Sequence, residues 1–108
     1  MSKVIDELYE VVLDRKANPG EGSYTSYLFE QGLDKILKKC GEELSEVIIA
    51  AKNGSNEELK AEIGDLIYHV LVLMAQTGLG LEELYELLEE RRKKTGNLKP
   101  VKQTDTES

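Results

Sequence analysis

Apolar residues recur every three or four positions along most of the chain, which is the spacing of amphipathic helices rather than of strands. A first helix is predicted from its cap at Ser2 to the break at residues 18–20. Residues 20–27 mix glycine with hydroxyl side chains, and they are predicted to form a loop that runs into a short helix ending at Phe29. The sequence predicts no strand and contains no repeat of fixed period.

Two long helices are predicted on either side of a sharp turn. Helical spacing continues from Leu33 to Lys52, and residues 53–56 (Asn-Gly-Ser-Asn) combine a helix stop with a new N-cap. The second long helix then runs from about Glu57 to a C-cap at Gly78. Because the linker is so short, we expect the two helices to fold back on each other as an antiparallel hairpin.

The C-terminal region completes the predicted domain. A last helix is expected from near Gly80 to the basic residues 91–94 and Gly96, since lysine and arginine suit the C-terminal end of a helix. The polar residues 99–108 are predicted to be a disordered tail. We therefore expect a single all-α domain, residues 1–98, built as a helical hairpin bundle of four to five helices.

Composition narrows the partners that such a domain can have. The 108 residues include 14 Lys and Arg against 21 Asp and Glu, a net charge of −7 that argues against a nucleic-acid partner. The single Cys40 cannot form an internal disulfide, the N-terminal segment lacks the apolar core of a signal peptide, and no apolar run is long enough to span a bilayer. We expect a soluble, cytoplasmic protein with no membrane partner, whose small aliphatic core is completed by dimerisation.

Acidic residues flank the predicted turn in a mirrored pattern. Glu42, Glu43 and Glu46 precede the turn and fall within about a quarter of the helix circumference, at about 100° per residue. Glu62 and Asp65 follow the turn and share one helix face. The residue pairs 46/62 and 43/65 are both centred on the turn, so an antiparallel hairpin brings acids of the two helices to the same level.

Such a cluster of like charges needs compensation by protons or cations. An all-oxygen set of ligands favours Mg²⁺, with Mn²⁺ or Ca²⁺ less suited, and Mg²⁺ commonly takes further ligands from substrate phosphates. The alternative is that each acid lies on a solvated helix face, as expected for the acids between residues 82 and 90 that can pair with residues 91–94. The mirrored placement favours metal-assisted phosphate chemistry.

Neighbouring residues are weaker candidates, each with two interpretations. Lys38 and Lys39 could offset the charge of the acids or hold a phosphate, and His69 could contact substrate or be a satisfied core residue. Gly41 and Gly64 lie inside predicted helices, where each costs about 1 kcal/mol relative to Ala. Either helix-to-helix packing or close approach of a metal or phosphate would explain these two glycines.

The motif Glu42-Glu43-x-x-Glu46, followed by Glu62-x-x-Asp65 on a helical hairpin, resembles the MazG-like all-α nucleoside triphosphate pyrophosphohydrolases. The surrounding segments are more specific. Gly-Ser-Tyr-Thr-Ser at 22–26, Lys-Lys-Cys-Gly-Glu-Glu at 38–43 and the segments 46–53 and 65–73 resemble the phosphoribosyl-ATP pyrophosphatase family of histidine biosynthesis. The resemblance covers about residues 4–94.

This resemblance implies a homodimer that hydrolyses phosphoribosyl-ATP between the α and β phosphates, releasing phosphoribosyl-AMP and pyrophosphate with Mg²⁺. By motif position it implies four metal ligands, with Glu42 as a neighbouring ligand or base and Glu46 also able to act in catalysis. The implied ligands are Glu43, Glu46, Glu62 and Asp65. Contacts to the substrate are predicted for Lys38, Lys39, His69 and the loop Ser23-Tyr24-Thr25.

Three other interpretations use the same acids. A housecleaning pyrophosphatase acting on free nucleoside triphosphates would share the acidic motif. A non-catalytic helical protein would present the acids to a basic partner. A di-iron carboxylate bundle normally has Glu-x-x-His ligand pairs, whereas the single histidine here follows Asp65 by four residues.

Overall fold

The computed structural model describes residues 2–94, which form five α-helices with no strand among them. The helices are α1 (Lys3–Ala17), α2 (Tyr24–Gln31), α3 (Leu33–Lys52), α4 (Asn56–Thr77) and α5 (Leu81–Lys93). The all-α prediction is therefore confirmed. The expected helix end at Gly96, the domain end at residue 98 and the predicted tail 99–108 lie outside the described residues.

Helix ends follow the predicted capping residues closely. The side chains of Ser2 and Ser55 accept hydrogen bonds from backbone N–H groups in the first turns of α1 and α4. Gly78 ends α4 in the left-handed conformation, at φ 80°, which favours glycine. One prediction is wrong: residues 24–27 are not loop, because Ser23 caps α2 and the helix begins at Tyr24.

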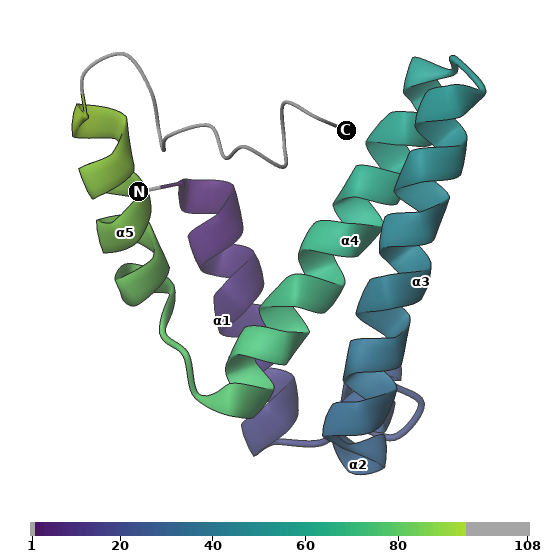
Figure 1. The fold of residues 1–108 in the computed structure, drawn as a ribbon. Helices are drawn as coiled ribbons and strands as arrows, with labels where there is room; N and C mark the ends of the chain where they lie inside the picture. The colour runs from purple at the N-terminus through teal and green to yellow at the C-terminus, as the bar shows by residue number, and fades with distance from the viewer. Residues whose placement is uncertain (1, 95–108) are drawn as a thin grey trace.

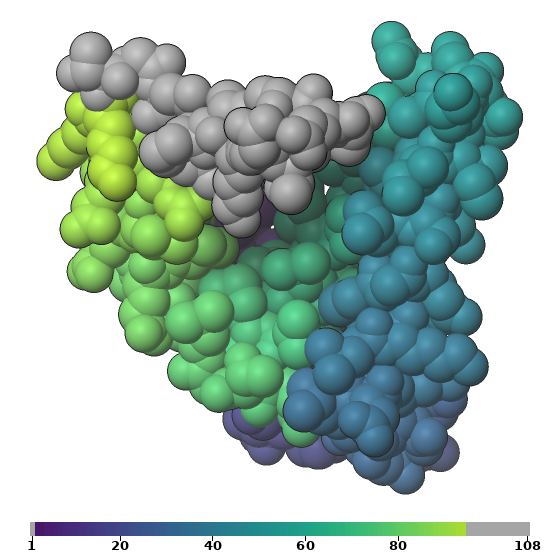
Figure 2. Space-filling model, in the orientation of Figure 1, coloured from purple at the N-terminus to yellow at the C-terminus, as the bar shows by residue number. Residues whose placement is uncertain are grey.

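The helices form two arms that meet at one end, as the ribbon in Figure 1 shows. One arm is the α3–α4 hairpin, and the other holds α1 and α5. The core lies at the junction, where α1, α2, α3 and α4 each contribute one fully buried side chain: Val12, Leu28, Ile36 and Val72. The half of the hairpin that carries the turn extends beyond this junction (Figure 2).

Much of the apolar pattern of α3 is left exposed in this chain. Of the positions that helical spacing marks as apolar, Ile36 is buried, whereas Leu37, Leu44 and Ile48 are 47%, 50% and 56% exposed. The physical reason is that the outer half of α3 packs almost entirely against α4, so one stripe of its apolar side chains has no covering helix among residues 2–94.

No single helix among residues 2–94 has the length and apolar character needed to cross a membrane. The only combination that meets those criteria joins α4 and α5, which are bent by 117° at the break between them.

Candidate active site

Glu43 is the acid that the fold buries most deeply. It is spaced seven residues from Ile36 and from Ala50, so all three lie on one stripe of α3, and all three are buried. Glu43 is only 7% exposed, whereas its sequence neighbour Glu42 is exposed. A carboxylate on the stripe that faces α4 is costly to bury, so its partners determine what the site does.

Three carboxylates converge where α3 and α4 face each other. One carboxylate oxygen from each of Glu43, Glu62 and Asp65 lies within 4.8 Å of the other two. Glu46 adjoins this trio, because its carboxyl group contacts those of both Glu43 and Glu62. The mirrored pairing about the turn, predicted from sequence, is therefore the pairing that the hairpin forms.

Two oxygens of the cluster lack a hydrogen-bond donor among the described residues. The Oε2 atoms of Glu43 and Glu62 are buried, and within the described part of the chain neither accepts a hydrogen bond. Contact with the Glu46 carboxyl, then burial and the charges of Asp65 and Glu43, raise the pKa of Glu62 to about 7. Burial first, then Glu46, raises the pKa of Glu43. Such groups bind a proton or a cation readily.

Lys39 is the basic residue that is ion paired with the acids of α3 in the described part of the chain. Its Nζ lies 3.5 Å from Oε1 of Glu42 and 3.7 Å from Oε1 of Glu43, one turn along α3. Glu42 is thereby directed to Lys39 and is not part of the trio with oxygens within 4.8 Å. Lys38 is exposed on α3. One partly exposed ammonium cannot neutralise four facing carboxylates.

His69 is buried and both ring nitrogens are engaged. Its Nδ1 donates to the main-chain oxygen of Asp65 at 2.7 Å, because a carbonyl can only accept. In the neutral ring Nε2 then accepts from the Tyr24 hydroxyl at 2.8 Å. This matches the interpretation of His69 as a satisfied core residue, and its predicted substrate contact stays a prediction.

The Ser23-Tyr24-Thr25 segment differs from the expected phosphate loop. Ser23 Oγ accepts from the backbone N–H of Ser26 as an N-cap. Thr25 is buried, and its hydroxyl is hydrogen bonded to that of Tyr68. The sequence analysis did not single out Tyr68, although its position beside His69 in an apolar run could have indicated a buried polar contact. Thr25 and Tyr24 thus both reach α4, Thr25 through Tyr68 inside the protein and Tyr24 through His69.

The two helix-interior glycines have open space beside them. A Cβ added at Gly41 or Gly64 would meet no atom of the described chain within 4 Å. Packing against the described residues of this chain therefore does not explain these two glycines. Close approach of a metal, a phosphate or a helix of another copy stays a prediction.

The residues of this site fit a divalent cation. Carboxylate oxygens are the ligands of hard cations, and two of them here are buried without a donor. A small cavity of about 150 Å³, lined by Glu46, Ile49, Ala50, Glu58 and Glu62, adjoins the cluster. An all-α hairpin with Glu-x-x-Glu facing Glu-x-x-Asp places the chain in the MazG-like class.

Comparison with known proteins gives the family within that class. Residues 5–92 match the family described as phosphoribosyl-ATP pyrophosphohydrolase. The phosphoribosyl-ATP pyrophosphatase of Clostridium novyi is 59% identical over 97 residues, 90% of this chain and 88% of that protein. The phosphoribosyl-ATP pyrophosphatase of Clostridium botulinum strain Hall is 55% identical over 103 residues, 95% of this chain and 94% of that protein. The chain belongs to the phosphoribosyl-ATP pyrophosphohydrolase family.

A further relative shows that this domain also occurs in longer proteins. The histidine biosynthesis bifunctional protein of Thermoanaerobacter pseudethanolicus is 60% identical over 85 residues, which cover 79% of this chain but 39% of that protein. The chain is an enzyme of this family, so the hypothesis of a non-catalytic acidic partner finds no support in these matches.

Proposed function

We propose that the chain hydrolyses phosphoribosyl-ATP to phosphoribosyl-AMP and pyrophosphate, the second step of L-histidine biosynthesis, with Mg²⁺ as cofactor and Mn²⁺ as a possible substitute. The single observation that carries the proposal is the set of facing carboxylates, with the buried Oε2 atoms of Glu43 and Glu62 lacking a donor. The substrate is the one that the names of the relatives state.

Glu43, Glu46, Glu62 and Asp65 would hold the cation. Bound Mg²⁺ would neutralise polyphosphate charge and lower the pKa of the attacking water. The protein holds these carboxylates in place before substrate arrives, because α3 and α4 are packed together along their lengths. Glu46 is exposed at the edge of the cluster, so it can accept the proton of the attacking water, with Glu42 as the alternative base.

Substrate phosphates would be met by the lysines of α3. Lys39 already lies beside Glu42 and Glu43, and Lys38 extends into solvent from the same helix. These ammonium groups favour the side of the cluster nearest the N-terminal half of α3 as the place for the polyphosphate. Ser23 lies at the start of α2, where backbone N–H groups can add further donors.

Pyrophosphate release from phosphoribosyl-ATP tests the proposal. We expect release in the presence of Mg²⁺ and its loss when a chelator removes the cation. Free triphosphates such as dUTP serve as competing substrates. Faster pyrophosphate release from dUTP than from phosphoribosyl-ATP would replace the proposed activity by that of a housecleaning pyrophosphatase.

We propose also that a second copy covers the apolar stripes that one chain leaves exposed. Leu37, Leu44 and Ile48 form one such stripe on α3, and a second runs along α4 with Ile63, Ile67 and Val70, which are 37–40% exposed. A stripe of this kind favours helix-to-helix association. Sedimentation equilibrium should give twice the chain mass, and Ile48→Glu should shift the protein towards the monomer. A monomeric wild-type chain at micromolar concentration would contradict the dimer.

A further inference from the structure

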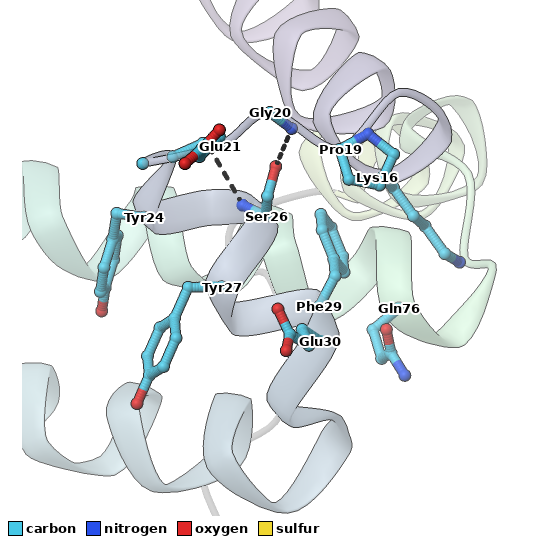
Figure 3. A pocket seen from close by; sticks show the side chains of 12 residues that line it. Lys16, Pro19, Gly20, Glu21, Tyr24, Ser26, Tyr27, Phe29, Glu30 and Gln76 are labelled. Carbon is cyan, nitrogen blue, oxygen red and sulfur yellow. Dashed lines mark hydrogen bonds between the residues drawn. The ribbon is translucent and has the colours of Figure 1, made fainter.

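A second cavity lies away from the carboxylate cluster, between α2 and the loop that precedes it. It has a volume of about 1060 Å³ (Figure 3). Its lining is mostly apolar, with the rings of Tyr24, Tyr27 and Phe29 and the loop residue Pro19, and the carboxylates of Glu21 and Glu30 complete it. An apolar cavity with a few polar groups is the usual form of a small-molecule site.

The aromatic residues of the chain are distributed unevenly around this cavity. The chain has six aromatic residues, all of them within the described residues. Four are buried or half-buried, and the two that are exposed, Tyr24 at 46% and Tyr27 at 42%, both line the cavity. They are three residues apart on α2, and their rings stack with centroids 6.3 Å apart and planes inclined by 29°.

The wall that carries these rings is held in place by hydrogen bonds. Gly20 N–H donates to Ser26 Oγ at 3.0 Å, and Ser23 N–H donates to the Gly20 carbonyl at 3.1 Å. The one lysine in the lining, Lys16, is engaged elsewhere, since its Nζ donates to the Ala75 carbonyl at 2.8 Å. The cavity therefore offers a preorganised aromatic face and no free ammonium of its own.

The charges around the cavity determine how an elongated ligand would lie. Glu21 and Glu30 are exposed at the cavity and repel phosphate. In the other direction Tyr24 reaches out of the cavity to His69, which lies four residues along α4 from Asp65, about 6 Å of helix rise. Burial raises the pKa of the Tyr24 hydroxyl, and the charges of Lys39 and Glu43 also act on it with opposite signs. Tyr24 thus joins the cavity to the carboxylate cluster.

We propose that this cavity binds the purine ring of a nucleotide against Tyr24 and Tyr27, with the phosphates directed to the carboxylate cluster and Lys39. A purine is chosen because the stacked pair of tyrosine rings presents an aromatic face, against which a bicyclic base covers more ring area than a single-ring base does. The placement of the phosphates at the carboxylate cluster rests on the proposed function. Binding of the base in the cavity can be tested separately, because the contacts of the base with Tyr24 and Tyr27 require neither the cation nor hydrolysis.

Binding of adenosine monophosphate to the full chain, without metal, tests the cavity. In NMR spectra with ring-labelled tyrosine, AMP should shift the Tyr24 and Tyr27 resonances and leave those of the buried Tyr85 in place. Pyrophosphate, which has no base, should leave all three in place. Shifts that spare Tyr24 and Tyr27 would overturn the proposal, and equally tight binding of cytidine monophosphate would overturn the choice of a purine.

Substitution of Tyr27 separates stacking from a general loss of structure. Tyr27→Ala should weaken AMP binding and raise the KM for phosphoribosyl-ATP by about tenfold with kcat little changed, since stacking contributes to binding before the chemical step. Tyr27→Phe keeps the ring and should restore both values to within about twofold. An unchanged KM in Tyr27→Ala would contradict base binding in the cavity, even if the chain releases pyrophosphate. If AMP shifts the Tyr24 and Tyr27 resonances but the chain releases no pyrophosphate, only the proposed function is contradicted.

Discussion

Two acidic regions of this molecule use the same residue type in opposite ways. On α5, Glu89 is ion paired with Arg92, and the hydrogen bond from that guanidinium lowers the pKa of the carboxyl. On the hairpin, Glu62 faces Glu46 instead of a cation, and the contact between the two carboxyls raises the pKa of Glu62 to about 7. Local partners, not acidity itself, therefore separate a solvated helix face from a site that accepts a cation.

The α5 acids are also used in ordinary structural roles. Glu83 Oε2 accepts from the Gly80 N–H at 2.9 Å and caps the start of α5. Glu86 and Glu90 are exposed. Every one of these positions can be satisfied by solvent, by a backbone donor or by a basic residue within the same helix. Glu43 and Glu62 each keep one buried oxygen that no group in the described chain satisfies.

The largest expected effect is on turnover. Glu43→Gln should lower pyrophosphate release by about 10³-fold or more, beyond the roughly 10–100-fold typical of a residue that only supports a metal ligand. The exposed Glu86→Gln on α5 is the matched control and should stay within about twofold of the wild-type chain. Steady-state kinetics with phosphoribosyl-ATP and Mg²⁺ gives both numbers. Equal activity of the two variants would contradict a difference in role between the acids of the α3–α4 hairpin and those of α5.

The next effect is on stability and depends on pH. Because the pKa of Glu62 in the folded chain, about 7, lies above its ordinary value of 4.5, the folded state keeps a proton that the unfolded chain has lost. The metal-free protein should therefore lose stability as pH rises from about 4.5 to 7, and Glu62→Gln should flatten this decline. Glu86→Gln should leave it in place. Thermal unfolding followed by circular dichroism at pH 5 and pH 8 measures the difference.

Mg²⁺ should reverse that decline. Above pH 7 the carboxylates of the cluster are ionised and can bind the cation, which stabilises the folded state by mass action. Saturating Mg²⁺ should therefore raise Tm by about 5 °C or more at pH 8, and by less at pH 5. An equal rise in Tm for the wild-type chain and for Glu62→Gln would mean that Mg²⁺ binds outside the carboxylate cluster.

The smallest effect concerns the glycines beside the acids. Gly41→Ala and Gly64→Ala should each stabilise the chain by about 0.5–1 kcal/mol, because the added methyl group meets no atom of residues 2–94 within 4 Å and alanine favours a helix. If a ligand or a second copy approaches there, the same variants should lose turnover. Urea unfolding measures the change in stability, and steady-state kinetics on the same samples measures the change in turnover. A gain in both stability and turnover would show that these glycines have no functional role.

The hairpin and its acids could be predicted because short-range rules fix them. A stop, a glycine and a new N-cap at residues 53–56 set the bend, and helix geometry then determines which acids face each other. The pairing of Glu43 with Asp65 and of Glu46 with Glu62 follows from that register alone.

The remaining features depend on tertiary packing, which periodicity does not determine. Helical spacing marks Leu44 and Ile48 as apolar but does not reveal that none of the five described helices covers them. The glycines before Ser23 suggest a loop, whereas Ser23 acts as a helix cap. The hydrogen bonds of Thr25 to Tyr68 and of Tyr24 to His69 join residues more than 40 positions apart, so no local pattern could show them.

Direct cation binding is the measurement that tests the central claim most closely. Mn²⁺, as a paramagnetic substitute for Mg²⁺, can be titrated into the full chain while electron paramagnetic resonance counts the free ion. We expect saturable binding to the wild-type chain and to Glu86→Gln, and affinity lowered by about tenfold or more in Glu62→Gln. Equal affinity in all three proteins would contradict a cation site between α3 and α4.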